Sequence, residues 1–337
     1  DGDGWGRDQY VGRGLRSLFF AAPDQGWVTG EFGQMFAWDG SGWQAEGRSE
    51  ALLLEQTLND IVVTANDGWA VGDRGTVLQW DGAGWSPVEV PEAWSWESLV
   101  AVVSSADHGA WIAGAGDTGL RRLPGAEAWE EVSLPATILA TSSEGLWGAG
   151  VSGTGGSIVR WNGSVWEETA PDGMAAVRAL DFVAPDDGWA LTDDSYARWD
   201  GSSWITSTAP FSGRVRALDM LTASDGWAAS DETAYHWDGS GWSAFPLPLA
   251  AFEDWKEEFV QDLVMADRDN GWIATNHGHI LRWDGRAWTI ESTGSGYMLR
   301  ALALAENGRL WAVGEGSPLT TWYTPSFDWQ VYLPLVQ

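Results

Sequence analysis

Apolar and polar residues alternate along most of the chain in short runs, and glycine, aspartate or asparagine separates one run from the next. The segments 15–20, 177–182 and 215–220 are apolar and rich in β-forming residues. Alternation with a period of two predicts β-strands, and Asp-Gly pairs predict tight turns because both residues tolerate positive φ. The pattern therefore predicts an all-β protein built from short antiparallel strands.

Tryptophan recurs among these strands at regular intervals. A tryptophan with a glycine one to three residues before it recurs every 36 to 45 residues. The eight copies are Trp27, Trp69, Trp111, Trp147, Trp189, Trp227, Trp272 and Trp311. A second motif, Trp-Asp-Gly-x-x-Trp, follows most copies about eleven residues later, as in Trp199–Trp204. Across a tight turn the two tryptophans of this motif share a sheet face and can touch. Each unit thus holds four strands, which we name A to D in chain order.

Four short strands repeated every ~40–45 residues are typical of a β-propeller. We predict one propeller domain over residues 1–337 with eight four-stranded blades, seven being the alternative. The approximate blades are 11–46, 56–90, 97–133, 135–169, 175–208, 213–247, 258–292 and 297–335. Residues 1–10 form a surplus or closing outer strand, because residues 329–333 already supply an outer strand to the last unit. We expect an overlap at ring closure or, alternatively, a free strand that pairs with another subunit.

Composition narrows the function classes. The 18 Lys and Arg against 48 Asp and Glu give a formal charge of −30, which disfavours nucleic acids and anionic membranes as partners. The absence of cysteine excludes disulfides, thiolate catalysis and Cys-ligated zinc. No apolar run is long enough to span a bilayer. No signal peptide is recognisable, which we interpret as a processed or trimmed chain.

The unit from Asp67 to Trp85 resembles the BNR-like, Ycf48-like family of bacterial β-propeller repeat proteins, and more distantly the sialidase-type propellers. The resemblance covers nearly the whole chain. It implies a propeller fold, a secreted, periplasmic or lumenal location, and a role in binding or assembly. Gly40-Ser-Gly-Trp43 keeps one end of the sialidase Asp-box, but Trp38 stands where that motif has its aspartate. Sialidase activity is therefore not expected.

The two longest connections between units carry candidate ligand-binding residues. Trp94 and Trp96 lie in the segment 91–97, and Trp255 and the only lysine, Lys256, lie in 245–259. These three tryptophans stand outside the repeat. Aromatic side chains on loops bind protein partners or sugars. The alternative is that they fold back as lids on the blade ends.

Arginine recurs at one strand-A position, in Arg16, Arg178, Arg216 and Arg300. Because strand A lines the axis of a propeller, these side chains would form a cationic ring that holds a carboxylate or a sulfate. The alternative is local pairing with Asp181 and Asp219, three residues further on in two units.

Signals for metals and catalysis are weak. His277 and His279 are weak metal candidates because they lack a third ligand. We expect no cofactor. Calcium could bind to the acidic pairs Asp193-Asp194, Asp231-Glu232 or Asp1/Asp3. The favoured interpretation of these pairs is a solvated acidic surface. The aspartates of the Trp-Asp-Gly motifs are interpreted as turn residues, on the face of the propeller opposite the connections between units. No Ser–His–Asp set stands out, so enzyme activity stays open and leans towards none.

We therefore expect a secreted or surface-exposed, non-catalytic interaction module that binds a protein partner or self-assembles. Its location would be extracellular, on the cell surface or periplasmic. One alternative is a glycan-binding lectin that uses the loop tryptophans and the arginine ring. The other is a glycoside hydrolase or lyase, which requires an acid pair with raised pKa in the channel mouth.

Overall fold

The computed structural model describes residues 15–22, 25–30, 35–38, 43–45, 57–64, 67–82, 85–142, 145–152, 155–251, 258–292, 298–304, 309–314 and 320–323. Of residues 15–45 it describes the backbone alone. The strands form antiparallel sheets in which each strand pairs with its neighbours in sequence. All-β architecture is thereby confirmed.

The strands of the first four sheets follow the predicted units. They are β1 Leu15–Ala22, β2 Gln25–Gly30, β3 Met35–Trp38 and β4 Trp43–Ala45; β5 Leu58–Val63, β6 Gly68–Gly72, β7 Val77–Trp80 and β8 Trp85–Pro87; β9 Leu99–Ser105, β10 Gly109–Gly114, β11 Thr118–Arg122 and β12 Glu130–Ser133; β13 Ile138–Ser142, β14 Gly145–Ser152, β15 Gly155–Trp161 and β16 Trp166–Glu168.

The remaining sheets continue the same order. They are β17 Ala179–Ala184, β18 Asp187–Leu191, β19 Ser195–Trp199 and β20 Trp204–Thr208; β21 Val215–Thr222, β22 Asp225–Ser230, β23 Thr233–Trp237 and β24 Trp242–Pro246; β25 Val260–Asp267, β26 Asn270–Thr275, β27 Ile280–Trp283 and β28 Trp288–Ser292; β29 Leu299–Leu304, β30 Arg309–Gly314 and β31 Thr320–Tyr323. Two 3-10 helices, Glu92–Trp94 and Pro248–Ala251, lie in the long connections.

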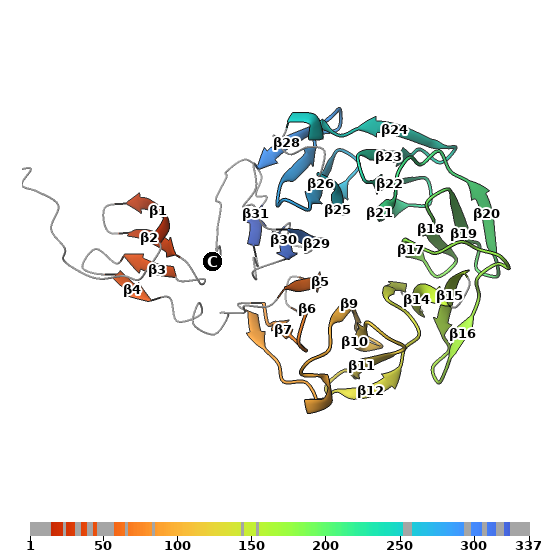
Figure 1. Cartoon of the computed structure of the whole chain (residues 1–337), viewed down its shortest axis with the longest axis horizontal. Coiled ribbons are helices and arrows are strands. Elements are labelled where there is room, and N and C mark those ends of the chain that lie inside the picture. Colours follow the sequence, from red (N-terminus) through yellow and green to blue (C-terminus); the bar gives the residue numbers. More distant parts are fainter. Residues whose placement is uncertain are drawn as a thin grey trace, which may run out of the picture.

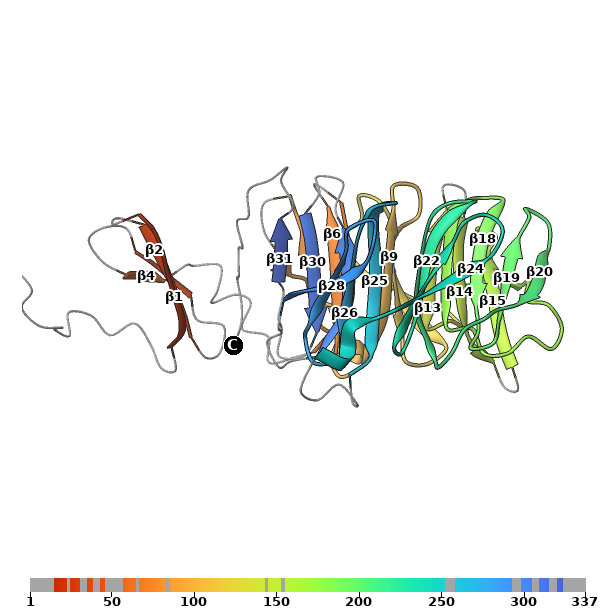
Figure 2. The ribbon, with the colours of Figure 1, turned by 90° about the horizontal axis from the view of Figure 1, so that it is seen from above.

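The ring begins at β5 and closes where β29 and β30 pack against β5 (Figure 1). Within the described residues, the ring holds six four-stranded blades and the three-stranded sheet β29–β31. The prediction of eight four-stranded blades is therefore wrong, and so is the alternative of seven. The sheet β1–β4 lies outside the ring (Figures 1 and 2). The predicted surplus strand, residues 1–10, and the outer strand at 329–333 lie outside the described residues.

The reason for the smaller ring is a contact between tryptophans at the closure. The ring centroids of Trp80 and Trp85 lie 5.0 and 5.4 Å from that of Trp311 in β30. An eighth blade would have to separate these indoles. The sheet β5–β8 thus packs directly against β29–β31, where the expected first blade, residues 11–46, would have to lie.

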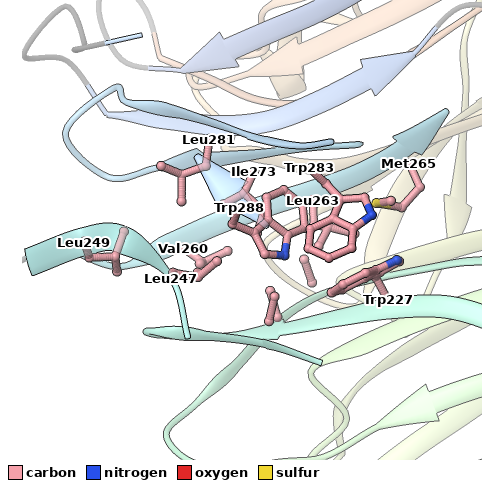
Figure 3. Close-up of a cluster of buried hydrophobic side chains, with 13 residues drawn as sticks. Trp227, Leu247, Leu249, Val260, Leu263, Met265, Ile273, Leu281, Trp283 and Trp288 are labelled. Carbon is pink, nitrogen blue, oxygen red and sulfur yellow. The ribbon is translucent and has the colours of Figure 1, made fainter. Parts of the chain in front are cut away.

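This contact occurs at five blade junctions in the described part of the chain, the closure included, whereas Trp69 packs on Trp129 alone because β11 has no tryptophan. A strand-B tryptophan packs against the tryptophans of strands C and D in the next blade. Trp147 contacts Trp199 and Trp204 at 5.1 and 6.0 Å, and those two indoles touch each other at 5.6 Å. Figure 3 shows the equivalent group, in which Trp227 lies beside Trp283 and Trp288. The tryptophan repeat is therefore the packing that joins blade to blade.

Half-buried aspartates on the innermost strands make a second link between blades. They are Asp60, Asp181, Asp219 and Asp262. In Asp60, Oδ1 accepts the N–H of Ile61 at 2.8 Å and Oδ2 accepts the N–H of Val102, in the next blade, at 2.7 Å. Each of the other three likewise accepts a backbone N–H from the innermost strand of the following blade. The carboxylates thus fasten consecutive inner strands to one another.

Burial raises the pKa of these carboxyl groups because the charged form is poorly solvated. The pKa of Asp60 rises to about 7, that of Asp262 to about 6, and that of Asp219, which also feels the charge of Asp181, to about 8. The pKa of Asp181 is raised as well, mainly by burial. At neutral pH the inner wall of the ring therefore carries less negative charge than its sequence suggests.

Candidate functional site

The strands of the ring run between two faces (Figure 2). One face, which we call the loop face, gathers the B–C loops and the connections between blades. Backbone hydrogen bonds tie these segments together, from Gly75 to Glu97, from Ala209 to Asp194 and from Leu247 to Glu232. Because the loops brace one another, the loop face presents its side chains from a fixed backbone.

The opposite face carries the turns between strands C and D. In the turn of β19–β20, Oδ1 of Asp200 accepts the N–H groups of Ser202 and Ser203. Hydrogen bonds from the Ser202 hydroxyl and from these amides lower the pKa of Asp200 to about 2. The same arrangement recurs at Asp238. The predicted turn role of the Trp-Asp-Gly acids is confirmed for these turns.

Trp94 and Trp96 have different environments although one residue separates them. Trp94 ends a 3-10 helix, is 4% exposed, and donates its Nε1–H to Glu131 Oε2 at 3.2 Å. Its ring packs against the backbone of Gly114 in the next blade. Trp96 is 80% exposed. Trp94 thus anchors the connection, as the lid alternative predicts, while Trp96 is accessible to a partner. Trp255 and Lys256 lie outside the described residues.

Arg74 lies next to Trp96, with its guanidinium carbon 5.8 Å from the centre of the indole. It adopts φ 54°, a conformation that costs free energy in a residue with a β-carbon. The following Gly75 donates its N–H to Glu97 O at 2.8 Å. A β-carbon at Gly75 would collide with the backbone of Trp94, so glycine is required for the two loops to approach. The sequence analysis missed Arg74, which carries no repeat signal.

Two of the strand-A arginines, Arg178 and Arg216, pair with acids of their own blades. Arg178 binds Asp193 through Nε and Nη2 at 2.9 to 3.2 Å, and Arg216 Nε binds Asp231 Oδ1 at 2.7 Å. Partial burial of Asp193 by itself would raise its pKa. Hydrogen bonds from Arg178 and from the N–H of Val215 outweigh burial and hold the pKa of Asp193 below its usual value. The expected partners Asp181 and Asp219 instead bind backbone N–H groups. Of the Arg16 side chain nothing is described, and Arg300 lies half-buried on β29.

A sequence signal for this pairing exists. Each of the four arginines is followed fifteen residues later by an acid, and none of the four units without arginine at the first position has an acid at the second. The pairs are Arg16/Glu31, Arg178/Asp193, Arg216/Asp231 and Arg300/Glu315, against Asn59/Arg74, Val100/Ala115, Ala136/Val151 and Gln261/Asn276. Arginine at the first position thus accompanies an acid at the second, which is expected of residues that neutralise each other.

His277 and His279 share one buried carboxylate. Their Nδ1 atoms lie 2.8 and 2.9 Å from the two oxygens of Glu258, which is buried. Burial would raise the pKa of Glu258, but hydrogen bonds from Thr275 and both histidines outweigh it and lower the pKa. The described residues contain no group of three or more His, Cys, Asp or Glu side chains arranged to hold a metal ion. Glu258 was not identified from the sequence, because nothing in its spacing marks it as a partner of the histidines.

Solved propeller structures resemble the chain. The structure described as Ycf48 bound to D1 peptide matches with a TM-score of 0.64 at 17% identity, over 80% of this chain and 93% of that one. The chain has a Ycf48-like β-propeller fold. The WD40 propeller of Doa1 matches with a TM-score of 0.64 at 13% identity, over 78% and 90% of the chains. The structure of a streptogramin B lyase matches with a TM-score of 0.65 at 10% identity, over 77% of this chain and 91% of that one.

No family model matches the sequence, and no curated protein matches it either. The structural neighbours include both binding proteins and an enzyme, so their likeness establishes the fold and leaves the function to the site. In the described part of the chain, no helix has the length and the apolar character needed to cross a bilayer.

Proposed function

We propose that this chain is a non-catalytic, protein-binding propeller that is secreted or exposed at a surface and that engages a partner polypeptide through its loop face. The observation that carries the proposal is the exposed Trp96 on a braced loop. A location outside the cytoplasm, extracellular, at the cell surface or periplasmic, is part of the proposal. It is suggested by the resemblance of the unit from Asp67 to Trp85 to a family whose members are largely secreted, periplasmic or lumenal.

Trp96 stands out from the other tryptophans with described side chains, because most of these are buried between blades. Tryptophan and arginine are the residues most enriched in binding hot spots, and Trp96 and Arg74 lie together. A folded monomer gains nothing from leaving an indole in water. A single exposed apolar side chain is common on folded proteins, so the support comes from the combination of an 80% exposed indole and an adjacent arginine on a braced loop.

The structural neighbours are compatible with this proposal. One of them is described as bound to a peptide and another belongs to a mitotic checkpoint complex, so this fold supports polypeptide binding in other proteins. A rigid ring with variable loops suits the role because the strands position the loops at little entropic cost.

Two alternatives receive less support. A lectin would stack sugars on Trp94, Trp96 and Trp255, but Trp94 is buried. Its arginine ring would need unpaired guanidinium groups, but Arg178 and Arg216 bind aspartates. A glycosidase needs carboxyls with raised pKa; the four inner-strand aspartates have raised pKa values, but in Asp60, Asp181 and Asp262 both oxygens already accept backbone N–H groups.

The test uses the absence of native cysteine, which permits labelling at one chosen site. A phage-displayed library of random peptides is selected on the intact chain. Binding of the enriched peptides is then compared for two variants coupled to a polyethylene glycol maleimide. Glu232→Cys places the polymer on the loop face, and Ser203→Cys places it on the opposite face.

We expect the polymer at position 232 to weaken peptide binding at least tenfold and the polymer at 203 to leave it unchanged. Failure to enrich any peptide would contradict a protein-binding function. Equal loss with both labels, or loss at 203 alone, would contradict the assignment of the loop face.

A further inference from the structure

We infer that Trp96 and Arg74 form the centre of the binding surface, and that the partner segment which covers them carries a lysine or arginine next to an apolar residue. The inference deepens the proposed function and rests on it. It assigns the contact to one connection, between β8 and β9, and gives the partner a chemistry.

The indole of Trp96 offers two kinds of contact. With 80% of its area exposed, it can bury a large apolar surface against a partner side chain. Arg74 lies 5.8 Å from its centre, and among the described residues Arg74 forms no ion pair. A ring face attracts cations through its quadrupole, so the indole can also receive a cationic group of the partner.

Charge favours a basic partner. Glu92 opens the 3-10 helix before Trp96, Glu97 follows Trp96 directly, and both are exposed, as is Glu89 in the same connection. These three carboxylates outnumber the one guanidinium of Arg74. The whole chain adds a formal charge of −30. An acidic segment would be repelled at long range, whereas a basic one would be attracted and steered towards this surface.

The surface is organised before any partner binds. Trp94 is held in the core by its hydrogen bond to Glu131 and fixes the helix that precedes Trp96. Asp73 Oδ1 accepts hydrogen bonds from Asn59 Nδ2 at 3.0 Å and from Ser98 Oγ at 2.7 Å, which fastens the loop of Arg74 to the end of the connection. Little backbone entropy is then lost on binding, which favours affinity.

The experiment compares peptides selected on the intact chain with their binding to variants. The synthetic consensus peptide is titrated by calorimetry into the parent, Trp96→Ala and Ile205→Ala. Ile205 is a matched control because it is 58% exposed but lies on the outer strand β20. We expect a consensus with lysine or arginine beside an apolar residue. We also expect about 30-fold weaker binding for Trp96→Ala and no change for Ile205→Ala.

Two further variants separate the contributions of charge. Arg74→Gly removes the guanidinium and keeps the positive φ, so the loop retains its shape. Because the guanidinium repels a basic partner, we expect several-fold tighter binding without loss of stability. The double variant Glu92→Gln/Glu97→Gln is expected to weaken binding several-fold and to reduce its dependence on salt. Glu232→Gln, an exposed acid elsewhere on the loop face, is the control for the double variant.

The outcomes distinguish the two proposals. Peptides that bind the parent and Trp96→Ala equally, or an acidic consensus, would overturn this inference and leave protein binding intact. If no peptide is enriched, both proposals fail. Glycans that bind the parent but not Trp96→Ala, with no peptide enriched, would make the chain a lectin.

Discussion

The ring should lose stability as the pH rises from 5 to 8, and Asp60→Asn should remove part of that loss. Asp60 is half-buried and binds the backbone N–H groups of Ile61 and Val102 in two adjacent blades. Burial raises its pKa from 3.8 to about 7. A group whose pKa is higher in the folded state contributes stability that is complete below its unfolded pKa and is lost as pH rises through its folded pKa.

The magnitude follows from that pKa. Between pH 5 and the folded value of about 7, Asp60 is ionised in the unfolded chain but protonated in the ring. Two pH units at about 1.4 kcal/mol each give a loss of about 3 kcal/mol. Since solvent reaches part of the side chain, screening makes this an upper value. Asparagine does not titrate, but it offers one acceptor oxygen in place of two. The variant therefore loses about 1 kcal/mol at every pH.

The assay is equilibrium unfolding in guanidinium chloride at pH 5, 6, 7 and 8, followed by tryptophan fluorescence. The decrease in the free energy of unfolding from pH 5 to pH 8 should be smaller in Asp60→Asn than in the parent by up to about 3 kcal/mol. Asp200→Asn is the control, because a carboxyl with pKa about 2 stays ionised across this range. An identical decrease in parent and Asp60→Asn would refute the reasoning.

Three further substitutions test the packing of the ring. Trp147→Ala removes an indole buried between two blades and should lower the free energy of unfolding by about 3–5 kcal/mol, measured by denaturant unfolding. Arg178→Met breaks the pair with Asp193, which is 43% exposed; we therefore expect a loss of only about 1 kcal/mol and a rise in the pKa of Asp193, measured by carboxyl NMR titration. Gly188→Ala places a methyl group against the ring of Phe182 and should cost about 1–3 kcal/mol, seen as a lower melting temperature; an unchanged melting temperature would contradict the packing described.

Local periodicity made the blades predictable. Residues 215–220 are mostly apolar and form most of β21, while Trp237 and Trp242 flank an Asp-Gly turn and pair across it. Such features depend on neighbours within about ten residues and on the two-residue period of a strand, so each unit can be recognised without knowledge of the others.

The candidate site was only partly predictable. The connection 91–97 was identified because its tryptophans fall outside the repeat, and Trp96 is indeed exposed. That Trp94 is instead buried depends on how the 3-10 helix turns and on the space beside Gly114 in the following blade. Arg74 became a candidate only because its loop lies beside that connection.

By itself, the sequence determined that the chain forms four-stranded units, where their turns lie, and that tryptophan joins the units. Tertiary structure decided how many units close the ring. Trp38–Trp43 and Trp80–Trp85 are the same motif, and either would match the strand-B tryptophan of the last blade. The structure places Trp80 and Trp85 on Trp311. Closure of the ring depends on the sum of the angles between all neighbouring sheets. Because this sum is a property of the whole ring, the sequence of one repeat does not reveal it.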